Sequence, residues 1–142
     1  EAGALVVGIA CNPGAPLLAA GDIGVLLDTG PEAISGSTRL KAGTAQKAAL
    51  NIFSTAAMVG LGRVYRGLMV EMQASNAKLR ARSLRMLQRL SGRGEDEARA
   101  ALEAASGDLK CAILVLLDGI DPAEARRRPA AAGGVVRRAR GG

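Results

Sequence analysis

The chain has 142 residues, of which 49% are apolar, and a formal net charge of +6 at pH 7. That length is enough for one ordinary domain or for parts of two. Tyr65 and Phe53 are the only aromatic residues, so the core must be aliphatic and stacking on bases or sugars is nearly excluded. The absence of His excludes histidine triads, His-based zinc sites and imidazole acid–base chemistry.

Cysteine usage, hydropathy and charge narrow the class of protein further. Cys11 and Cys111 are a hundred residues apart and do not have the spacing of a metal site. Two such cysteines are typical of a cytosolic protein with reduced thiols. No apolar run reaches the roughly 18 residues that a membrane span needs, so we expect a soluble, cytoplasmic protein without membrane contact. The charge excess lies in residues 72–142, with fourteen Lys and Arg against eight Asp and Glu. Because these charges are mixed along helix faces, nucleic-acid binding is the less favoured interpretation.

Two short apolar runs at the start predict parallel strands. ALVVGIA (4–10) is continuous and ends at CNPGAP, and DIGVLLDTG (22–30) follows after a helical turn in PLLAA. Two such strands with a brief crossover are typical of the end of an α/β domain. Two parallel strands cannot bury both of their faces, and the chain begins at Glu1 without a Met, so we expect further sequence upstream.

A long helix is predicted from near Ser37 to about Val59, and its start is a candidate anion site. A helix N-terminus attracts anions because its N–H groups are unpaired and the helix dipole is positive there. Hydroxyl and cationic side chains gather at this start, and the candidate binding residues are Ser37, Thr38, Arg39, Lys41 and Thr44. The alternative is that Ser37 or Thr38 only caps the helix while the cations are solvated. The pattern alone favours neither interpretation.

The second half of the chain is predicted to be helical. GRVYRGLMVEM (62–72) could be a strand or a linker, which the pattern does not decide. From Asn76 a leucine stripe marks an Arg-rich helix that SGRG (91–94) ends. Residues 94 to about 138 then predict a three-helix unit joined by short loops, which would be small and stable mainly against a neighbour.

Capping residues mark the helices of that unit. Asp108 is a predicted N-cap. Asp121, Pro122 and Glu124 have the arrangement of a capping box with proline at the first helical position. Pro129 falls inside the last helix and is expected to kink or end it.

Acidic side chains that could act as general acid or base are few in the first half, and none is paired at helical spacing. They are Glu1, Asp22, Asp28, Glu32 and Glu71. The remaining acids are typical of helix caps and solvated faces. The local sequence therefore assigns no catalytic residue.

Long motifs in this sequence resemble one family, the N-acetylmuramic acid 6-phosphate etherases. The motifs are GIACNPG, TGPEAISGSTRLKAGTAQKAALNIFSTAAMVGLGRVYRGLMVEMQASNAKLRAR and ARAALEAASGDLKCAILVLLDGIDPAEARRR with AAAGG. The STRLKAGTAQ core is also similar to the segment that borders the phosphosugar pocket in sugar isomerase (SIS) domains. The resemblance runs along nearly the whole chain.

The resemblance implies an α/β fold in two parts. Residues 1–75 would be the C-terminal part of a doubly wound, parallel-sheet sugar isomerase domain, and residues 76–142 a small all-helical unit with a basic tail, similar to ubiquitin-associated folds. It implies a homodimer without cofactor or metal. The reaction would be the cleavage of the lactyl ether of N-acetylmuramic acid 6-phosphate, giving N-acetylglucosamine 6-phosphate and lactate in peptidoglycan recycling.

The resemblance also limits what this chain can do. In the family the catalytic glutamates lie upstream of the CNPG segment, so no catalytic residue is carried over and the chain alone is expected to be inactive. Ser37, Thr38, Arg39, Lys41 and Thr44 are carried over as residues that line the phosphosugar pocket. Pro129 departs from the family, which usually continues its last helix there.

Two other classes of function compete with the lyase. One is a non-catalytic sugar-phosphate sensor, because regulators of sugar kinases share the fold and a similar motif. The other is an interaction module that docks a partner through the helical unit, although Leu102, Ile113 and Leu117 fit an internal core better.

Overall fold

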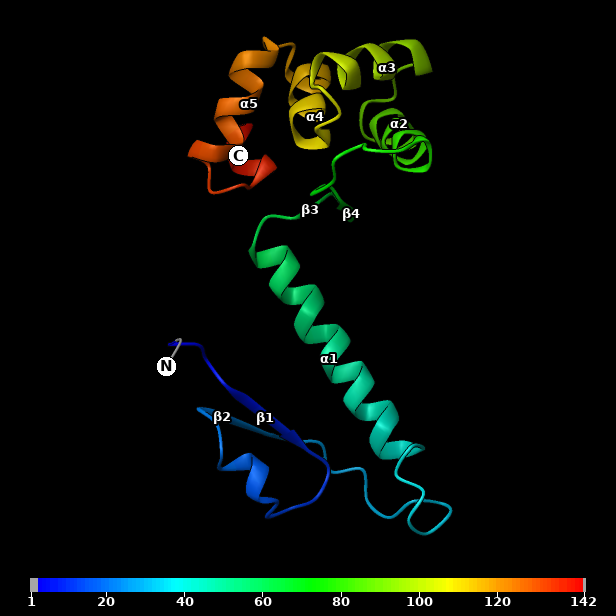
Figure 1. The fold of residues 1–142 in the computed structure, drawn as a ribbon, viewed down its shortest axis with the longest axis vertical. Helices are drawn as coiled ribbons and strands as arrows, with labels where there is room; N and C mark the ends of the chain where they lie inside the picture. The colour runs from blue at the N-terminus through cyan, green and yellow to red at the C-terminus, as the bar shows by residue number, and fades with distance from the viewer. Residues whose placement is uncertain (1–2, 142) are drawn as a thin grey trace. The chain divides into compact units, whose positions relative to one another are not determined.

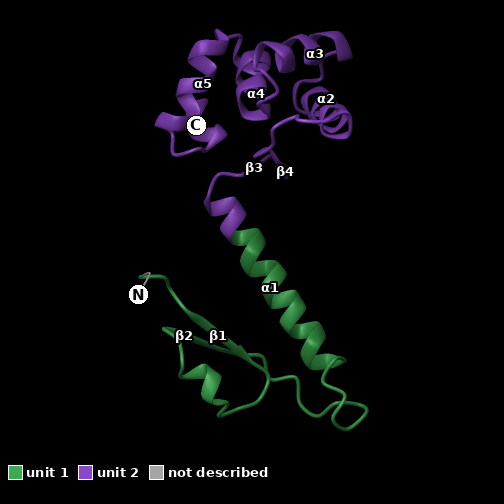
Figure 2. Cartoon of the chain, viewed as in Figure 1, with its two compact units in different colours: residues 1–56 green, residues 57–142 purple. Residues whose placement is uncertain are grey.

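The computed structural model describes residues 3–141, and its chain divides into two compact units, one up to Ala56 and one from Ala57 onward (Figure 2). The chain is mixed α/β and mostly helical, as predicted, with one small parallel sheet (Figure 1). The domain boundary between residues 75 and 76 stays a prediction about the intact protein.

The first unit contains the parallel strand pair, which confirms that prediction. β1 (Val7–Ala10) pairs with β2 (Ile23–Leu26), with Val7 opposite Ile23, and the 3₁₀ turn η1 (Pro16–Leu18) connects them. Two glycines in the strands allow η1 to lie directly against the sheet. A Cβ at Gly8 would lie 2.2 Å from the Leu17 carbonyl oxygen, and a Cβ at Gly24 would lie 2.3 Å from the Leu18 carbonyl oxygen. Both strands are shorter than the apolar runs predicted.

α1 (Lys41–Gly60) is the predicted long helix, but it begins four residues later than Ser37. None of its 20 residues is buried. Its large apolar side chains are therefore open to solvent, and Ile52 and Phe53 are 70% and 57% exposed. Among the described residues, no helix combines the length and the hydropathy that crossing a bilayer requires.

A β-hairpin occupies the segment that the sequence left open between strand and linker. β3 (Val64–Tyr65) pairs antiparallel with β4 (Leu68–Met69). The two turn residues, Arg66 and Gly67, have φ of 47° and 76°. Two successive positive φ values are what a tight two-residue hairpin turn requires, and arginine is an unusual choice for the first position.

Five helices follow the hairpin and form the core of the second unit. They are α2 (Ala77–Ser91), α3 (Glu95–Ala104), α4 (Leu109–Asp118), α5 (Pro122–Ala131) and α6 (Val136–Ala139). α4 packs against α2, α3 and α5. The cluster of buried side chains also takes in Tyr65 and Val70, so the hairpin and its linker contribute to the core. The predicted three-helix unit is therefore part of a larger core that includes α2 and α6.

The helix caps agree with the sequence in part. The Asp108 carboxylate accepts from the Cys111 N–H at 3.0 Å, and the Asp121 carboxylate accepts from the Ala123 N–H at 2.8 Å, which confirms both N-caps. The prediction of a capping box at α5 is wrong. The Glu124 carboxylate accepts hydrogen bonds from the Arg128 guanidinium, one turn along the helix, and not from the backbone N–H of Asp121. α5 continues two residues beyond Pro129 and ends at Ala131.

Candidate functional site

The predicted binding segment lies beside the end of β1. Cys11 follows β1 directly, and its thiol donates to the carbonyl oxygen of Ala42 in the first turn of α1, with the sulfur 3.7 Å from that oxygen. The tertiary fold of the first unit therefore brings the CNPG loop to the start of α1. Loops at the carboxyl ends of parallel strands are where ligands gather in α/β proteins.

The N-terminus of α1 is capped by a residue that the sequence did not indicate. The two oxygens of Glu32 accept from the N–H groups of Lys41 and Ala42, each at 2.9 Å. These backbone bonds, first that from Ala42 and then that from Lys41, hold the pKa of Glu32 below its ordinary value. The predicted alternative that Ser37 or Thr38 caps the helix is wrong, since the helix starts at Lys41 and Glu32 occupies its free N–H groups.

The loop that joins Glu32 to α1 is folded tightly onto the helix start. The Ser37 N–H donates to the Ile34 carbonyl at 3.0 Å, and the Gly43 N–H donates to the Thr38 carbonyl at 2.8 Å. Gly36 has φ of 77°, a value that favours glycine. A Cβ at Gly43 would lie 3.2 Å from the Thr38 carbonyl oxygen, so a larger residue would require the loop to shift by a few tenths of an ångström. These contacts hold Ser37 and Thr38 next to the first turn.

The five predicted binding residues are divided between the helix and the loop. Lys41 and Thr44 lie one turn apart on α1 and line one open hollow of about 590 Å³ with Leu40. Ser37, Thr38 and Arg39 precede this hollow on the loop and do not line it. Within residues 3–141, none of the five side chains makes a hydrogen bond to another residue, so their hydroxyl and amino groups are available to a ligand.

Sequence reasoning missed Glu32 because no periodicity connects it to α1. It lies nine residues before Lys41 and was classed with acids that have no partner. The usable signal was its position in a Pro-Glu pair at the start of a short loop before a helix. A carboxylate there can reach back to unpaired N–H groups, as any anion does at a helix N-terminus.

Glu32→Gln is expected to loosen the start of α1. The neutral amide binds two backbone N–H groups less strongly than a carboxylate, so the amides of Lys41 and Ala42 should exchange with solvent faster. Because folding lowers the pKa of Glu32, the carboxylate stabilises the cap above its ordinary pKa of 4.5 and this stabilisation is lost as pH falls through the lower folded value. Hydrogen exchange of the two amides measures the effect. Equal exchange in Glu32→Gln and the parent chain would contradict it.

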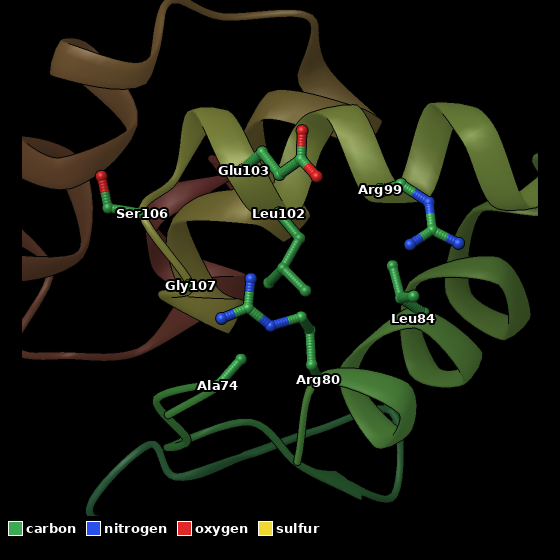
Figure 3. A pocket seen from close by; sticks show the side chains of 8 residues that line it. All are labelled: Ala74, Arg80, Leu84, Arg99, Leu102, Glu103, Ser106 and Gly107. Carbon is green, nitrogen blue, oxygen red and sulfur yellow. The ribbon is translucent and has the colours of Figure 1, made fainter. Parts of the chain in front are cut away.

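The helical unit has a separate pocket that contains none of the predicted residues (Figure 3). It measures about 210 Å³ and lies among α2, α3 and the turn that follows α3. Leu84 and Leu102 contribute apolar side chains to its lining, and Arg80 and Arg99 contribute guanidinium groups (Figure 3). Arg99 is paired with Glu95 on the helix surface, and Glu103 also lines the wall. The mixed charge does not define a class of ligand.

Comparison with known proteins shows what the sequence of this chain is similar to. No protein-family model matches the chain. Curated bacterial proteins named N-acetylmuramic acid 6-phosphate etherase are similar to it over almost its full length. The protein of Deinococcus radiodurans is 56% identical over 140 residues, which are 99% of this chain and 46% of the relative. The proteins of Rubrobacter xylanophilus and Streptomyces coelicolor are 52% and 51% identical over 99% and 96% of this chain.

The residues of the parallel strand pair and of the start of α1 lie within the stretch over which the chain is similar to these etherases. The chain spans about half the length of the curated relatives that it matches. It resembles the C-terminal part of N-acetylmuramic acid 6-phosphate etherase along nearly its whole length, as the sequence motifs indicated.

Proposed function

We propose that this chain provides the C-terminal part of a cytoplasmic N-acetylmuramic acid 6-phosphate etherase. The intact enzyme would be a lyase that cleaves the lactyl ether of the phosphosugar and releases N-acetylglucosamine 6-phosphate and lactate in peptidoglycan recycling. The observation that carries the proposal is the 56% identity to a protein of that name over 99% of this chain. The identity covers the loop and α1 together with the helical unit.

In the intact enzyme, the start of α1 would form one wall of the phosphosugar pocket. Glu32 already occupies the N–H groups of Lys41 and Ala42, so a bound phosphate has to be held chiefly by side chains. Lys41 and Thr44 offer an ammonium and a hydroxyl from the helix, and Ser37, Thr38 and Arg39 offer two hydroxyls and a guanidinium from the loop. Charge-assisted bonds of this kind suit a phosphate group.

The exposed apolar surface of the first unit supports the larger fold that the resemblance implies. In β2, Ile23 and Leu26 are 48% and 44% exposed on opposite faces of the strand, and α1 buries none of its residues. A doubly wound sugar isomerase domain and a homodimer would cover such surfaces. Residues 76–142 would then be the ubiquitin-associated-like appendage.

Replacing Lys41 by Ala in a full-length etherase that carries this sequence is expected to weaken phosphosugar binding. Loss of one charge-assisted hydrogen bond should cost about 1 to 3 kcal/mol of binding free energy. Calorimetric titration with N-acetylmuramic acid 6-phosphate measures the dissociation constant. Lys78→Ala, at an exposed lysine on α2, is the matched control and should leave it unchanged. If the dissociation constant is unchanged in Lys41→Ala and the fold is intact, Lys41 is a solvated surface residue and does not bind the phosphosugar.

The polypeptide of 142 residues is expected to self-associate in solution. Its exposed leucine, isoleucine and phenylalanine side chains on β2 and α1 favour burial against another copy. Light scattering should therefore report dimers or larger species. A monodisperse monomer at the same concentration would contradict this expectation.

A non-catalytic sugar-phosphate sensor is the second candidate function. Three acids of the first unit are engaged with backbone, since Asp22 accepts from Val6, Asp28 from Gly30 and Glu32 from α1. This arrangement favours binding over proton transfer within this chain. A glutamate-bearing segment upstream in the gene would favour the lyase, and a gene without one would favour the sensor.

A further inference from the structure

Three arginines converge on a pocket of the second unit that is separate from the start of α1. The pocket measures about 390 Å³ and lies where the β3–β4 turn meets the end of the chain. Tyr65, Arg66, Arg137, Arg140 and Gly141 line it. Its size falls within the range of small-molecule sites, and all of its charged lining residues are cationic.

Arg140 is held in a fixed orientation. Its Nε donates to the Asp118 carboxylate at 2.7 Å, and its Nη1 donates to the Tyr65 hydroxyl at 2.6 Å. The hydrogen bond to Asp118 is the main reason that the pKa of Arg140 is raised, and the bond to Tyr65 adds to it. Asp118 and Tyr65 use two of the five guanidinium N–H groups, so the others stay available to a ligand.

Arg66 reaches the same pocket from the hairpin turn. Its guanidinium carbon lies 5.6 Å from the centre of the Tyr65 ring, over the face of that ring. Its φ of 47° lies in the left-handed region, where glycine is favoured and arginine is unusual. Arg66 therefore has a backbone conformation that glycine adopts more easily, and its side chain lines the pocket.

The net charge of the side chains around the pocket is suited to a ligand with two negative charges. Arg66, Arg137 and Arg140 contribute three positive charges, and Asp118, which pairs with Arg140, contributes one negative charge. The remaining charge of about +2 matches a phosphate monoester, which carries nearly two negative charges at neutral pH. Arginine is suited to phosphate because its planar fork of N–H groups can bind two phosphate oxygens.

We propose that the pocket of Tyr65, Arg66, Arg137 and Arg140 binds the phosphate group of a small phosphate monoester. Arg140 is the preorganised contact, and Arg66 and Arg137 complete the charge around the phosphate. The site is independent of the etherase proposal, because it uses no residue of the loop or of α1.

Tyr65 provides a direct test, since it is the only tyrosine and the chain has no tryptophan. The full chain is titrated with a hexose 6-phosphate, with inorganic phosphate and with the unphosphorylated hexose at constant ionic strength, while Tyr65 emission is recorded. We expect saturable changes with both phosphates and none with the hexose. A lower midpoint for the hexose phosphate than for inorganic phosphate indicates a monoester, and equal midpoints indicate recognition of the phosphate group alone.

Two variants separate binding from folding. Arg137→Gln removes one exposed guanidinium and should raise the midpoint about tenfold, as expected for a lost charge-assisted bond. Arg66→Gly removes the second guanidinium while giving the turn its preferred residue, so it should weaken binding without loss of thermal stability. Arg85→Gln on α2, outside the pocket, is the matched control and should bind as the parent chain does.

Three results would overturn the proposal. They are the absence of a saturable Tyr65 signal with either phosphate, an equal signal with the unphosphorylated hexose, and unchanged midpoints in both Arg137→Gln and Arg66→Gly.

Discussion

Replacing Ile113 by Ala is expected to lower the free energy of unfolding of the helical unit by about 2 to 5 kcal/mol, the usual cost of removing a buried isoleucine side chain. Ile113 is 0% exposed and lies in α4, the helix that packs against α2, α3 and α5. Leu87 and Leu109 belong to the same buried cluster, so the atoms removed from Ile113 leave a cavity in a packed core. This loss is a large part of the stability of a small domain.

Urea denaturation followed through Tyr65 emission measures that effect, because Tyr65 is 5% exposed in the same core. Ile34→Ala is the matched control, since Ile34 is 63% exposed and lies in the loop before α1, outside the surfaces expected to self-associate. The control should change the unfolding free energy by less than about 0.5 kcal/mol, as surface substitutions usually do. Equal midpoints for the two variants would show that α4 is not the centre of the core.

A polypeptide of these 142 residues is expected to release no lactate from N-acetylmuramic acid 6-phosphate. General acid–base catalysis needs a group that exchanges protons near neutral pH. Glu32 is unsuited, because its pKa is lowered by the two backbone bonds that it accepts. Glu71 is tied to the buried ammonium of Lys110, which also donates to the Gly134 carbonyl at 2.7 Å.

A coupled lactate assay with the purified polypeptide tests this expectation, and the full-length protein from Deinococcus radiodurans serves as the positive control. Lactate release that persists after removal of contaminating full-length enzyme would contradict it. In that case Glu32→Gln would show whether the carboxylate at the helix start takes part. We therefore expect no detectable turnover from the polypeptide under conditions in which the full-length positive control releases lactate.

The sequence determined the local structure where short-range chemistry decides the conformation. The β-branched runs around Val7 and Val25 formed parallel strands, and Asp108 and Asp121 became N-caps through contacts within three residues. Long, specific motifs also indicated the etherase resemblance that the relatives confirm. The strand runs, the caps and the motifs each depend on residues that lie close together in the chain, so a pattern can show them, whereas the pairing of Val7 with Ile23 joins residues 16 apart.

Tertiary structure decided the features that join distant residues. Glu32 reached the start of α1 across nine residues and occupies the N–H groups of Lys41 and Ala42, where the alternative interpretation placed a hydroxyl cap. Arg140 met Tyr65 across 75 residues to form the arginine pocket. One interpretation of the segment around GSTRLKAGTAQK was an anion site on its helix N–H groups, and a carboxylate of the chain itself occupies two of them. Sequence periodicity is silent about such contacts because loop closure, and not spacing along a helix or strand, brings their atoms together.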